Sequence, residues 1–300
     1  MSIAETLFLQ DSQDSQDPKN RTCFILGGGP SLTKTQIESL WKQRFSGQEN
    51  EVFSIPKRQE QENEVFSMLQ KQEQEQEQKQ EQKQEQEQKQ EQEQEQENFV
   101  FFDELNKRRR RRRRRRFFLF VINNSYLLAP WADLLYFGDL KWFLLHKDRQ
   151  EFKEFKGIKV TIRADIRRFL SAQDKDSEIF LVKKGRYSGL CKDFESVGHG
   201  NNSGHQLINL CWHLGFKKVV LLGFDMRWVD GKNHWEGHDN HPGQPTSLQE
   251  YEIFMLPFFK ELAQDLKEDG RMEVLNATCD SALLDFPFTT LDKELKTLSF

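Results

Sequence analysis

The chain has 300 residues, with 44 lysines and arginines, 48 aspartates and glutamates, and a formal net charge of −4. Because an acidic Gln/Glu tract offsets a run of arginines, this mean charge does not identify a partner. The four cysteines are scattered without a C-x-x-C spacing, which argues against a disulfide framework and a cysteine zinc site.

The N-terminal residues 1–20 carry the polar repeat DSQDSQD, and we expect a disordered tail there. Their short apolar patch has no basic segment ahead of it, as a secretory signal would require. No later apolar run is long enough to span a bilayer as a transmembrane segment. We therefore expect a soluble, cytoplasmic protein.

The first ordered elements are predicted between residues 21 and 46. A short apolar run over residues 23–26 meets three glycines, and the sequence TKTQIESLWKQRF then has the composition of a helix. Strand, glycine turn and helix in this order are typical of an α/β unit.

Residues 47–116 form a low-complexity insertion that contains a Gln/Glu tract and the arginine run Arg108–Arg116. Polar repeats cannot bury enough apolar surface to offset the entropy of ordering, so we expect disorder or a solvated helix. Clustered arginines can neutralise phosphates. However, this run lies beside an acidic tract and lacks a recognition helix or an aromatic platform, so no specific nucleic-acid partner is predicted.

Strands and helices are predicted to alternate after the insertion. Apolar runs begin at Phe117 and Ala132, and GIKVTIRAD and EIFLVKK supply further short strands. NNSGHQLINLCWHLG predicts a helix, KKVVLLGFD a strand, residues 247–270 a long amphipathic helix, and MEVLNAT a last strand. The fold class predicted is α/β, Rossmann-like, with a mostly parallel sheet, helices on both faces and the low-complexity insertion. Residues 21–46 and 117–300 would form one discontinuous nucleotide-binding domain.

The glycine turn is the first candidate binding element. Gly28 and Gly29 lie where the first strand should end, and glycines there allow backbone N–H groups to approach a phosphate or ribose. The segment lacks both the G-x-G-x-x-G fingerprint and a P-loop lysine. A tight turn with Ser31 or Thr33 capping the helix is the structural alternative.

Polar residues follow three further strands and open one helix. Ligands of open α/β sheets bind outside the carboxyl ends of the strands, so these side chains should face one crevice. Turn formation alone would also favour such residues. Because neither Asp139 nor Asp225 belongs to a D-x-D pair at its strand end, a metal-bridged diphosphate donor is less favoured. The residues concerned are Asn123, Asn124, Asp139, Asp225, Ser203 and Gly204.

Histidines gather in a loop after Asp225, where His234, His238 and His241 are bounded by glycine and proline. Their spacing matches no familiar zinc site, so no metal is predicted. A general-base role for one of them is favoured, because histidine titrates near neutral pH.

The order of GGGPSL, INNSY, NNSGHQLINLCWHLGFKKVVLLGFD, a histidine-bearing loop and NATCDSALL resembles the bacterial sialyltransferases of glycosyltransferase family 42 and related uncharacterised bacterial and phage proteins. The resemblance covers residues 22–45 and 117–292. It implies that His241 is the general base. It also implies nucleotide contacts by Gly28, Gly29, Ser31, Asn123, Ser203, Gly204, Thr278 and Ser281.

Two departures from that family matter. Gly28 stands where the family has an asparagine, which removes a side-chain hydrogen bond to the nucleotide. The tyrosines that stabilise the leaving phosphate have no clear equivalent after Asp225, and Arg227 is predicted to neutralise the phosphate instead.

The resemblance implies a metal-independent, inverting transferase that uses a CMP-sugar donor, an unknown acceptor and no cofactor. GGGPSL and LLGFD are also similar to the archaeal hydroxymethylpterin diphosphokinases, which use ATP and magnesium. A catalytically silent nucleotide-binding or phage morphogenetic protein of the same fold is a third alternative. A homo-oligomer is compatible with all three.

Overall fold

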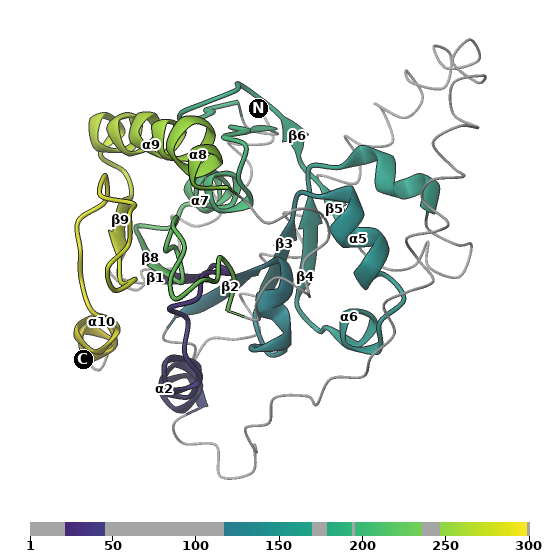
Figure 1. The fold of residues 1–300 in the computed structure, drawn as a ribbon, viewed down its shortest axis with the longest axis horizontal. Helices are drawn as coiled ribbons and strands as arrows, with labels where there is room; N and C mark the ends of the chain where they lie inside the picture. The colour runs from purple at the N-terminus through teal and green to yellow at the C-terminus, as the bar shows by residue number, and fades with distance from the viewer. Residues whose placement is uncertain (1–21, 46–116, 170–178, 194–195, 236–246, 299–300) are drawn as a thin grey trace, which may run out of the picture.

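The computed structural model describes residues 22–45, 117–169, 179–193, 196–235 and 247–298 (Figure 1). Their centre is a seven-stranded sheet in the order β5-β4-β3-β2-β1-β8-β9, in which every pairing is parallel. This sheet confirms the predicted Rossmann-like α/β fold. Its strands are β1 (Thr22–Leu26), β2 (Phe118–Ile122), β3 (Leu134–Phe137), β4 (Ile158–Thr161), β5 (Ile179–Leu181), β8 (Lys218–Leu222) and β9 (Glu273–Asn276).

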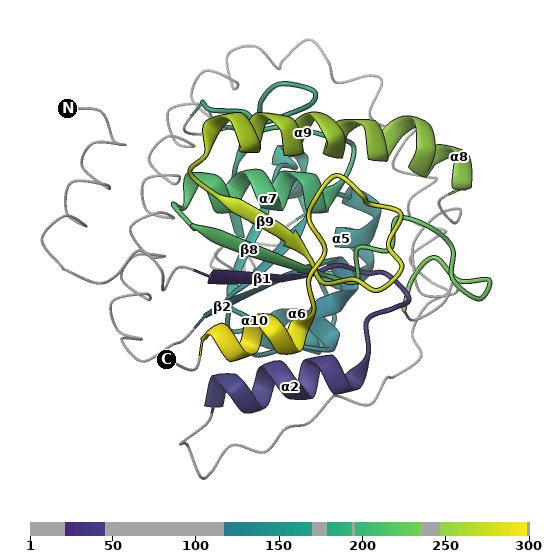
Figure 2. The same cartoon turned by 90° about the vertical axis from the view of Figure 1, so that its left-hand side faces the viewer.

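Helices cover both faces of the sheet, as the two packed layers in Figure 2 show. Because both faces are buried, the strands are nearly continuous apolar runs. One face packs against α7 (Ser203–His213) and α9 (Leu256–Asp269). The other packs against α2 (Lys34–Phe45), α5 (Leu140–His146), α6 (Gln150–Glu154) and α10 (Leu291–Thr297). A small separate sheet pairs β6 (Lys183–Lys184) with β7 (Ser196–Val197).

The strand order reverses at β1. From β1 the chain builds the sheet in one direction through β2, β3, β4 and β5, and β8 then returns to the opposite side of β1. In the register, Leu26 of β1 faces Val121 of β2 and Leu222 of β8. Loops from neighbouring strands diverge at such a switch point, and the crevice between them is where ligands of open α/β sheets bind.

The described residues that flank the low-complexity insertion lie close together. Arg44, in the last turn of α2, pairs with Asp133 at 2.7 Å, and its guanidinium lies 6.0 Å from the centre of the Phe117 ring. The insertion itself, its arginine run and the predicted N-terminal tail lie outside the described residues. The chain therefore leaves the fold at the end of α2 and re-enters it nearby at β2.

The long helix predicted over residues 247–270 is interrupted. It consists of α8 (Leu248–Glu250), a π-helical turn η7 (Tyr251–Met255) and α9. The interruption precedes Pro257, which has no N–H to donate and whose ring would clash with the carbonyl one turn back in a regular α-helix. Leu256 N–H instead donates to Tyr251 O, five residues back.

Other short elements had no clear sequence signal. They are α5, α6, α10 and the 3-10 turns η3 (Asn123–Leu127) and η4 (Ala164–Phe169). Within the described ranges, no helix is both long and apolar enough to cross a membrane.

Candidate functional site

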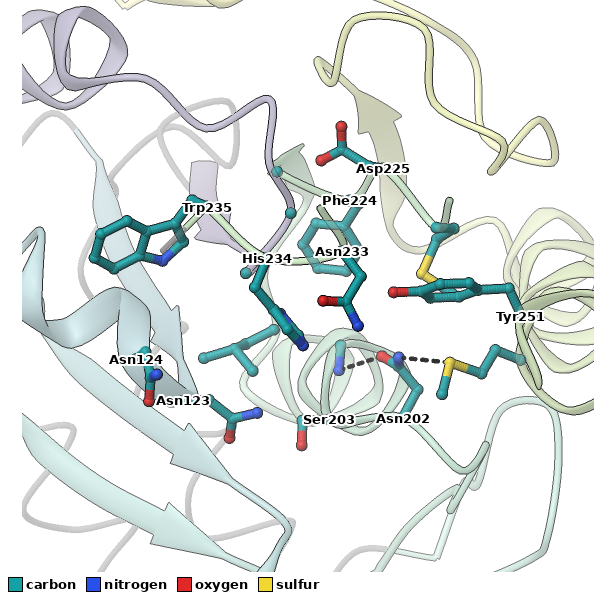
Figure 3. Close-up of a pocket in the computed structure, with 18 of the residues that line it drawn as sticks. Asn123, Asn124, Asn202, Ser203, Phe224, Asp225, Asn233, His234, Trp235 and Tyr251 are labelled. Carbon is teal, nitrogen blue, oxygen red and sulfur yellow. Dashed lines mark hydrogen bonds between the residues drawn. The ribbon is translucent and has the colours of Figure 1, made fainter. Parts of the chain in front are cut away.

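A cavity of about 270 Å³ opens at the carboxyl ends of the strands, beside the switch point (Figure 3). The end of β2, the segments that follow β1, β2, β3 and β8, the start of α7 and the turn η7 converge on it. Its polar lining includes Asn123, Asn124, Asp139, Asn201, Asn202, Ser203, Asp225, Asn233, His234 and Tyr251. Its other lining residues include Gly27, Gly28, Gly29, Ile122, Gly204, Gly223, Phe224, Met226, Trp235 and Met255.

The glycine turn after β1 packs directly against the end of β8. Gly29 N–H donates to Gly223 O at 2.8 Å, and Ser125 Oγ donates to Gly27 O at 2.6 Å. A Cβ atom on Gly29 would lie 1.8 Å from Asp225 Oδ2, so only glycine fits there. Hydrogen bonds with residues that follow β2 and β8 thus hold the turn on both sides.

Asp225 organises this turn. Its carboxylate accepts hydrogen bonds from Ser31 Oγ at 2.9 Å and from Ser31 N–H at 3.3 Å. Burial raises the pKa of Asp225, and the hydrogen bonds from Ser31 partly oppose that shift. In Figure 3 the carboxylate points away from His234 and Asn233. The geometry thus gives Asp225 a positioning role.

Thr278 and Ser281 bind the backbone of Phe224, next to Asp225, from outside the cavity lining. Thr278 Oγ1 accepts from Phe224 N–H at 2.9 Å, and Ser281 Oγ donates to Phe224 O at 2.5 Å. Both side chains are buried and lie outside the lining of the cavity. Their hydrogen bonds fix the backbone between Gly223 and Asp225.

The end of β2 contributes two asparagines. Asn124 is buried, and its Oδ1 accepts a hydrogen bond from Trp142 Nε1. Asn123 begins the turn η3 with a φ of 47°, and its Oδ1 has no hydrogen-bond partner among the described residues. Asp139 caps α5, because its Oδ1 accepts from Lys141 N–H at 2.6 Å.

The N-terminus of α7 forms one wall of the cavity. Asn202 caps the helix, and its Oδ1 accepts from Gly204 N–H at 2.7 Å. Asn202 Nδ2 donates to Met255 Sδ at 3.5 Å, which joins α7 to the π-helical turn (Figure 3).

Unusual backbone conformations concentrate around the cavity. Five non-glycine residues of the described structure have positive φ, and three of them line it: Asn123 at 47°, Asn201 at 48° and Met226 at 51°. Asparagine adopts this conformation readily, whereas methionine does so at a cost. Such strain is common at binding sites, where the surrounding structure has to enforce it.

The loop after β8 folds back to the glycine turn. The sequence contains a tight-turn signal for this, which the predictions above did not include. Val229 and Lys232 pair antiparallel around Asp230-Gly231, whose φ values are 49° and 72°. Asp-Gly is a preferred pair for a tight hairpin turn of this kind. The turn brings the next three residues, Asn233–Trp235, into the lining.

His234 and Trp235 meet the glycine turn directly. Trp235 N–H donates to Gly28 O at 3.0 Å. A Cβ on Gly28 would lie 3.3 Å from His234 Nδ1, so the imidazole faces the turn. Among the three clustered histidines, His234 is the one that the described structure places at the cavity.

Most of the residues predicted from strand ends are brought together. Gly28, Gly29, Asn123, Asn124, Asp139, Ser203, Gly204 and Asp225 line the cavity, whereas Ser31, Thr278 and Ser281 support it from behind. The half-buried Arg227 is not part of the lining. His238 and His241 lie outside the described residues.

The described part of the chain holds no group of three or more His, Cys, Asp or Glu side chains arranged to bind a metal ion.

Comparisons of the chain with protein-family models, with curated proteins and with solved structures found no match.

Proposed function

We propose that the chain is an inverting transferase that uses a CMP-activated sugar without a metal ion. The observation that supports this most strongly is the cavity itself, which combines the glycine turn, the polar end of β2 and the N-terminus of α7 at the switch point of a parallel sheet. Sites built in this way bind nucleotides, because backbone N–H groups and a helix N-terminus both favour phosphate.

The charge of the lining favours a ligand with few phosphate charges. Its polar side chains are mostly amides, and its carboxylates are Asp139 and Asp225. The nucleotide part of a CMP-sugar carries a single phosphodiester charge, which the positive end of α7 and the side-chain amides of the lining would stabilise. A nucleoside triphosphate would bring several negative charges close to the two carboxylates. This contrast favours the CMP-sugar over a triphosphate bound without magnesium, whereas carboxylates that bind magnesium would suit the ATP-dependent diphosphokinase reaction.

In this proposal the phosphate binds at the glycine turn, beside His234. The imidazole would donate a hydrogen bond to the phosphate as the bond from its oxygen to the anomeric carbon breaks. The acceptor oxygen attacks the opposite face of that carbon, and its proton passes to the general base, to which we assign His241. CMP then leaves with the bonding electron pair.

A thermal-shift panel of CMP, CTP, ATP with magnesium, and NAD tests the nucleotide. A ligand that binds the folded state alone stabilises it by about 2.7 kcal/mol at a hundred times its dissociation constant. We expect CMP to raise the melting temperature most. CTP, which has the same base but carries triphosphate charges, should raise it less than CMP and more than ATP with magnesium or NAD. A larger shift with ATP and magnesium would instead favour the diphosphokinase.

Histidine variants test the assigned roles. Replacing a general base slows the chemical step by roughly 10²–10⁴-fold and leaves donor binding nearly unchanged. His241→Ala should therefore still bind CMP, whereas His234→Ala should weaken CMP binding. Wild-type turnover by His241→Ala, together with loss of turnover in His238→Ala, would show that the base is misassigned.

A further inference from the structure

Unpaired polar atoms concentrate at the cavity. Eight buried side-chain nitrogen and oxygen atoms have no hydrogen-bond partner within the described structure, and four of them belong to the lining residues Asn123, Asn233 and Trp235. Buried polar groups are nearly always paired, so each exception needs an explanation. A bound ligand that supplies the missing partners would explain these four together.

Asn233 is the clearest of these cases. Its side chain is 2% exposed, and neither Oδ1 nor Nδ2 has a partner among the described residues. Asn209, which is fully buried in α7, shows the contrasting situation. Its Oδ1 accepts from Cys191 N–H and Gly198 N–H, both at 2.8 Å, and its Nδ2 donates to Cys191 O at 3.0 Å.

The position of Asn233 indicates which part of a ligand it would meet. In Figure 3 it lies between His234 and Tyr251, above the N-terminus of α7, whereas Asn123 and Asn124 lie on the other side of His234. Tyr251 and Met255, the two ends of the π-helical turn, also line this side of the cavity. π-Helical turns inside helices frequently occur at functional sites.

This side of the cavity combines a donor and an acceptor with aromatic and thioether surface. An amide can accept from one hydroxyl or N–H group and donate to a neighbouring hydroxyl or carbonyl oxygen. Aromatic and apolar side chains pack against the C–H faces of the same group. Sugars that carry adjacent hydroxyls or an N-acyl group have this chemistry.

We propose that Asn233 determines specificity for the sugar attached to the nucleotide, by binding adjacent hydroxyl or N-acyl groups through both of its amide atoms. This inference rests on the proposed use of a CMP-sugar. It assigns the sugar to the side of Tyr251 and Met255, and the nucleotide to the glycine turn and the end of β2.

The first test compares stabilities without ligand and does not depend on the proposed function. Asn233→Leu removes an unpaired amide, so its melting temperature should equal or exceed that of the wild type. Asn209→Leu, the matched control, breaks three hydrogen bonds and should melt about 5 °C lower or more. A loss in Asn233→Leu as large as in the control would make Asn233 a structural residue and overturn the inference.

The second test measures binding of CMP and of CMP-N-acetylneuraminic acid by calorimetry. In the wild type the sugar should strengthen binding over CMP. Asn233→Leu should reduce that preference about ten- to hundredfold while binding CMP as before. An unchanged preference with intact CMP binding would overturn the role of Asn233 alone. Failure of the wild type to bind either compound would overturn the proposed function and the sugar subsite with it.

Discussion

Asparagines occupy two neighbouring regions of this protein in different ways. Behind the cavity, Asn209 and Asn276 are fully buried and use both ends of their amides, Asn276 by donating to Leu283 O and accepting from Thr278 N–H, each at 3.0 Å. At the cavity, Asn233 is almost as buried, yet its amide has no partner among the described residues. The same side chain thus supports the fold in one region and remains available in the other.

The two regions should therefore differ in how substitutions affect stability and ligand binding. A paired buried amide fixes the backbone that it contacts, and removing it leaves other groups unpaired. An unpaired amide lowers stability until a ligand completes its hydrogen bonds. We therefore expect substitutions in the support behind the cavity to act on folding, and substitutions in the lining to act on binding.

The largest loss of stability should follow Asp133→Ala. Asp133 pairs with Arg44 through two hydrogen bonds of 2.7 and 2.8 Å, and both side chains are buried. Removing one partner leaves a buried charge uncompensated, which costs about 3–5 kcal/mol. Urea unfolding would measure this loss.

Asp148→Ala is the control for that substitution, because its pair with Lys147 is solvent-exposed. It should change the free energy of unfolding by less than about 1 kcal/mol. Equal losses in the two variants would contradict the structural importance of the Arg44–Asp133 pair.

Acidic pH should lower the free energy of unfolding, because His205 then takes up a proton when the chain unfolds. This side chain is fully buried in α7, and burial lowers its pKa to about 4, against a hydrogen bond from its ring to Gly198 O that raises it. Between pH 6.5 and 4 the unfolded chain binds the proton that the folded chain excludes. Stability from this group is therefore complete above pH 6.5 and falls by about 3 kcal/mol as the pH drops to 4.

Unfolding free energies measured between pH 7 and pH 4.5 would test this prediction, with His205→Gln as the control. The slope of the unfolding free energy against pH gives the number of protons taken up on unfolding. In the variant this number should be smaller by about one. His213 and His199, whose pKa values are also lowered by burial, would account for part of the remaining slope. An identical slope in the variant and the wild type would contradict the assignment to His205.

Two adjacent glycines should differ in the same way. A Cβ on Gly29 would overlap Asp225 Oδ2 at 1.8 Å and Gly223 O at 2.5 Å, so Gly29→Ala should destabilise the fold by about 1–3 kcal/mol. A Cβ on Gly28 would meet only His234, at 3.3 Å or beyond. Gly28→Ala should therefore leave stability within about 0.5 kcal/mol and weaken CMP binding. Thermal melts with and without CMP would separate these effects, and a reversed pattern would contradict our division of the two glycines.

The smallest effect should come from deleting residues 48–116 and joining the ends with a short flexible linker. The described chain leaves at α2 and returns at β2, where Arg44 contacts both Asp133 and Phe117. The closure entropy of a loop depends only weakly on its length, so the free energy of unfolding should change by about 1 kcal/mol or less. An insoluble or non-cooperatively melting product would contradict the predicted domain boundaries.

The sequence predicted the elements whose signals are local. Alternating apolar runs and helices predicted the parallel sheet, and polar residues after β2, β3 and β8 predicted a shared edge. The sequence did not predict the π-helical turn before Pro257, nor the short helices α5, α6 and α10. These segments depend on what they pack against, because a few residues carry too little periodicity to specify a helix alone.

The composition and apolar patterning of the chain predicted the fold class and the edge of the sheet where the candidate site lies, because strand burial leaves a direct pattern along the chain. The tertiary structure decided which side chains face the cavity. It brought Asn233 and His234 to the glycine turn through a tight hairpin, and it assigned Asp225, Thr278 and Ser281 to support. Whether a buried amide is paired depends on atoms from distant segments, and no local pattern in the sequence encodes that.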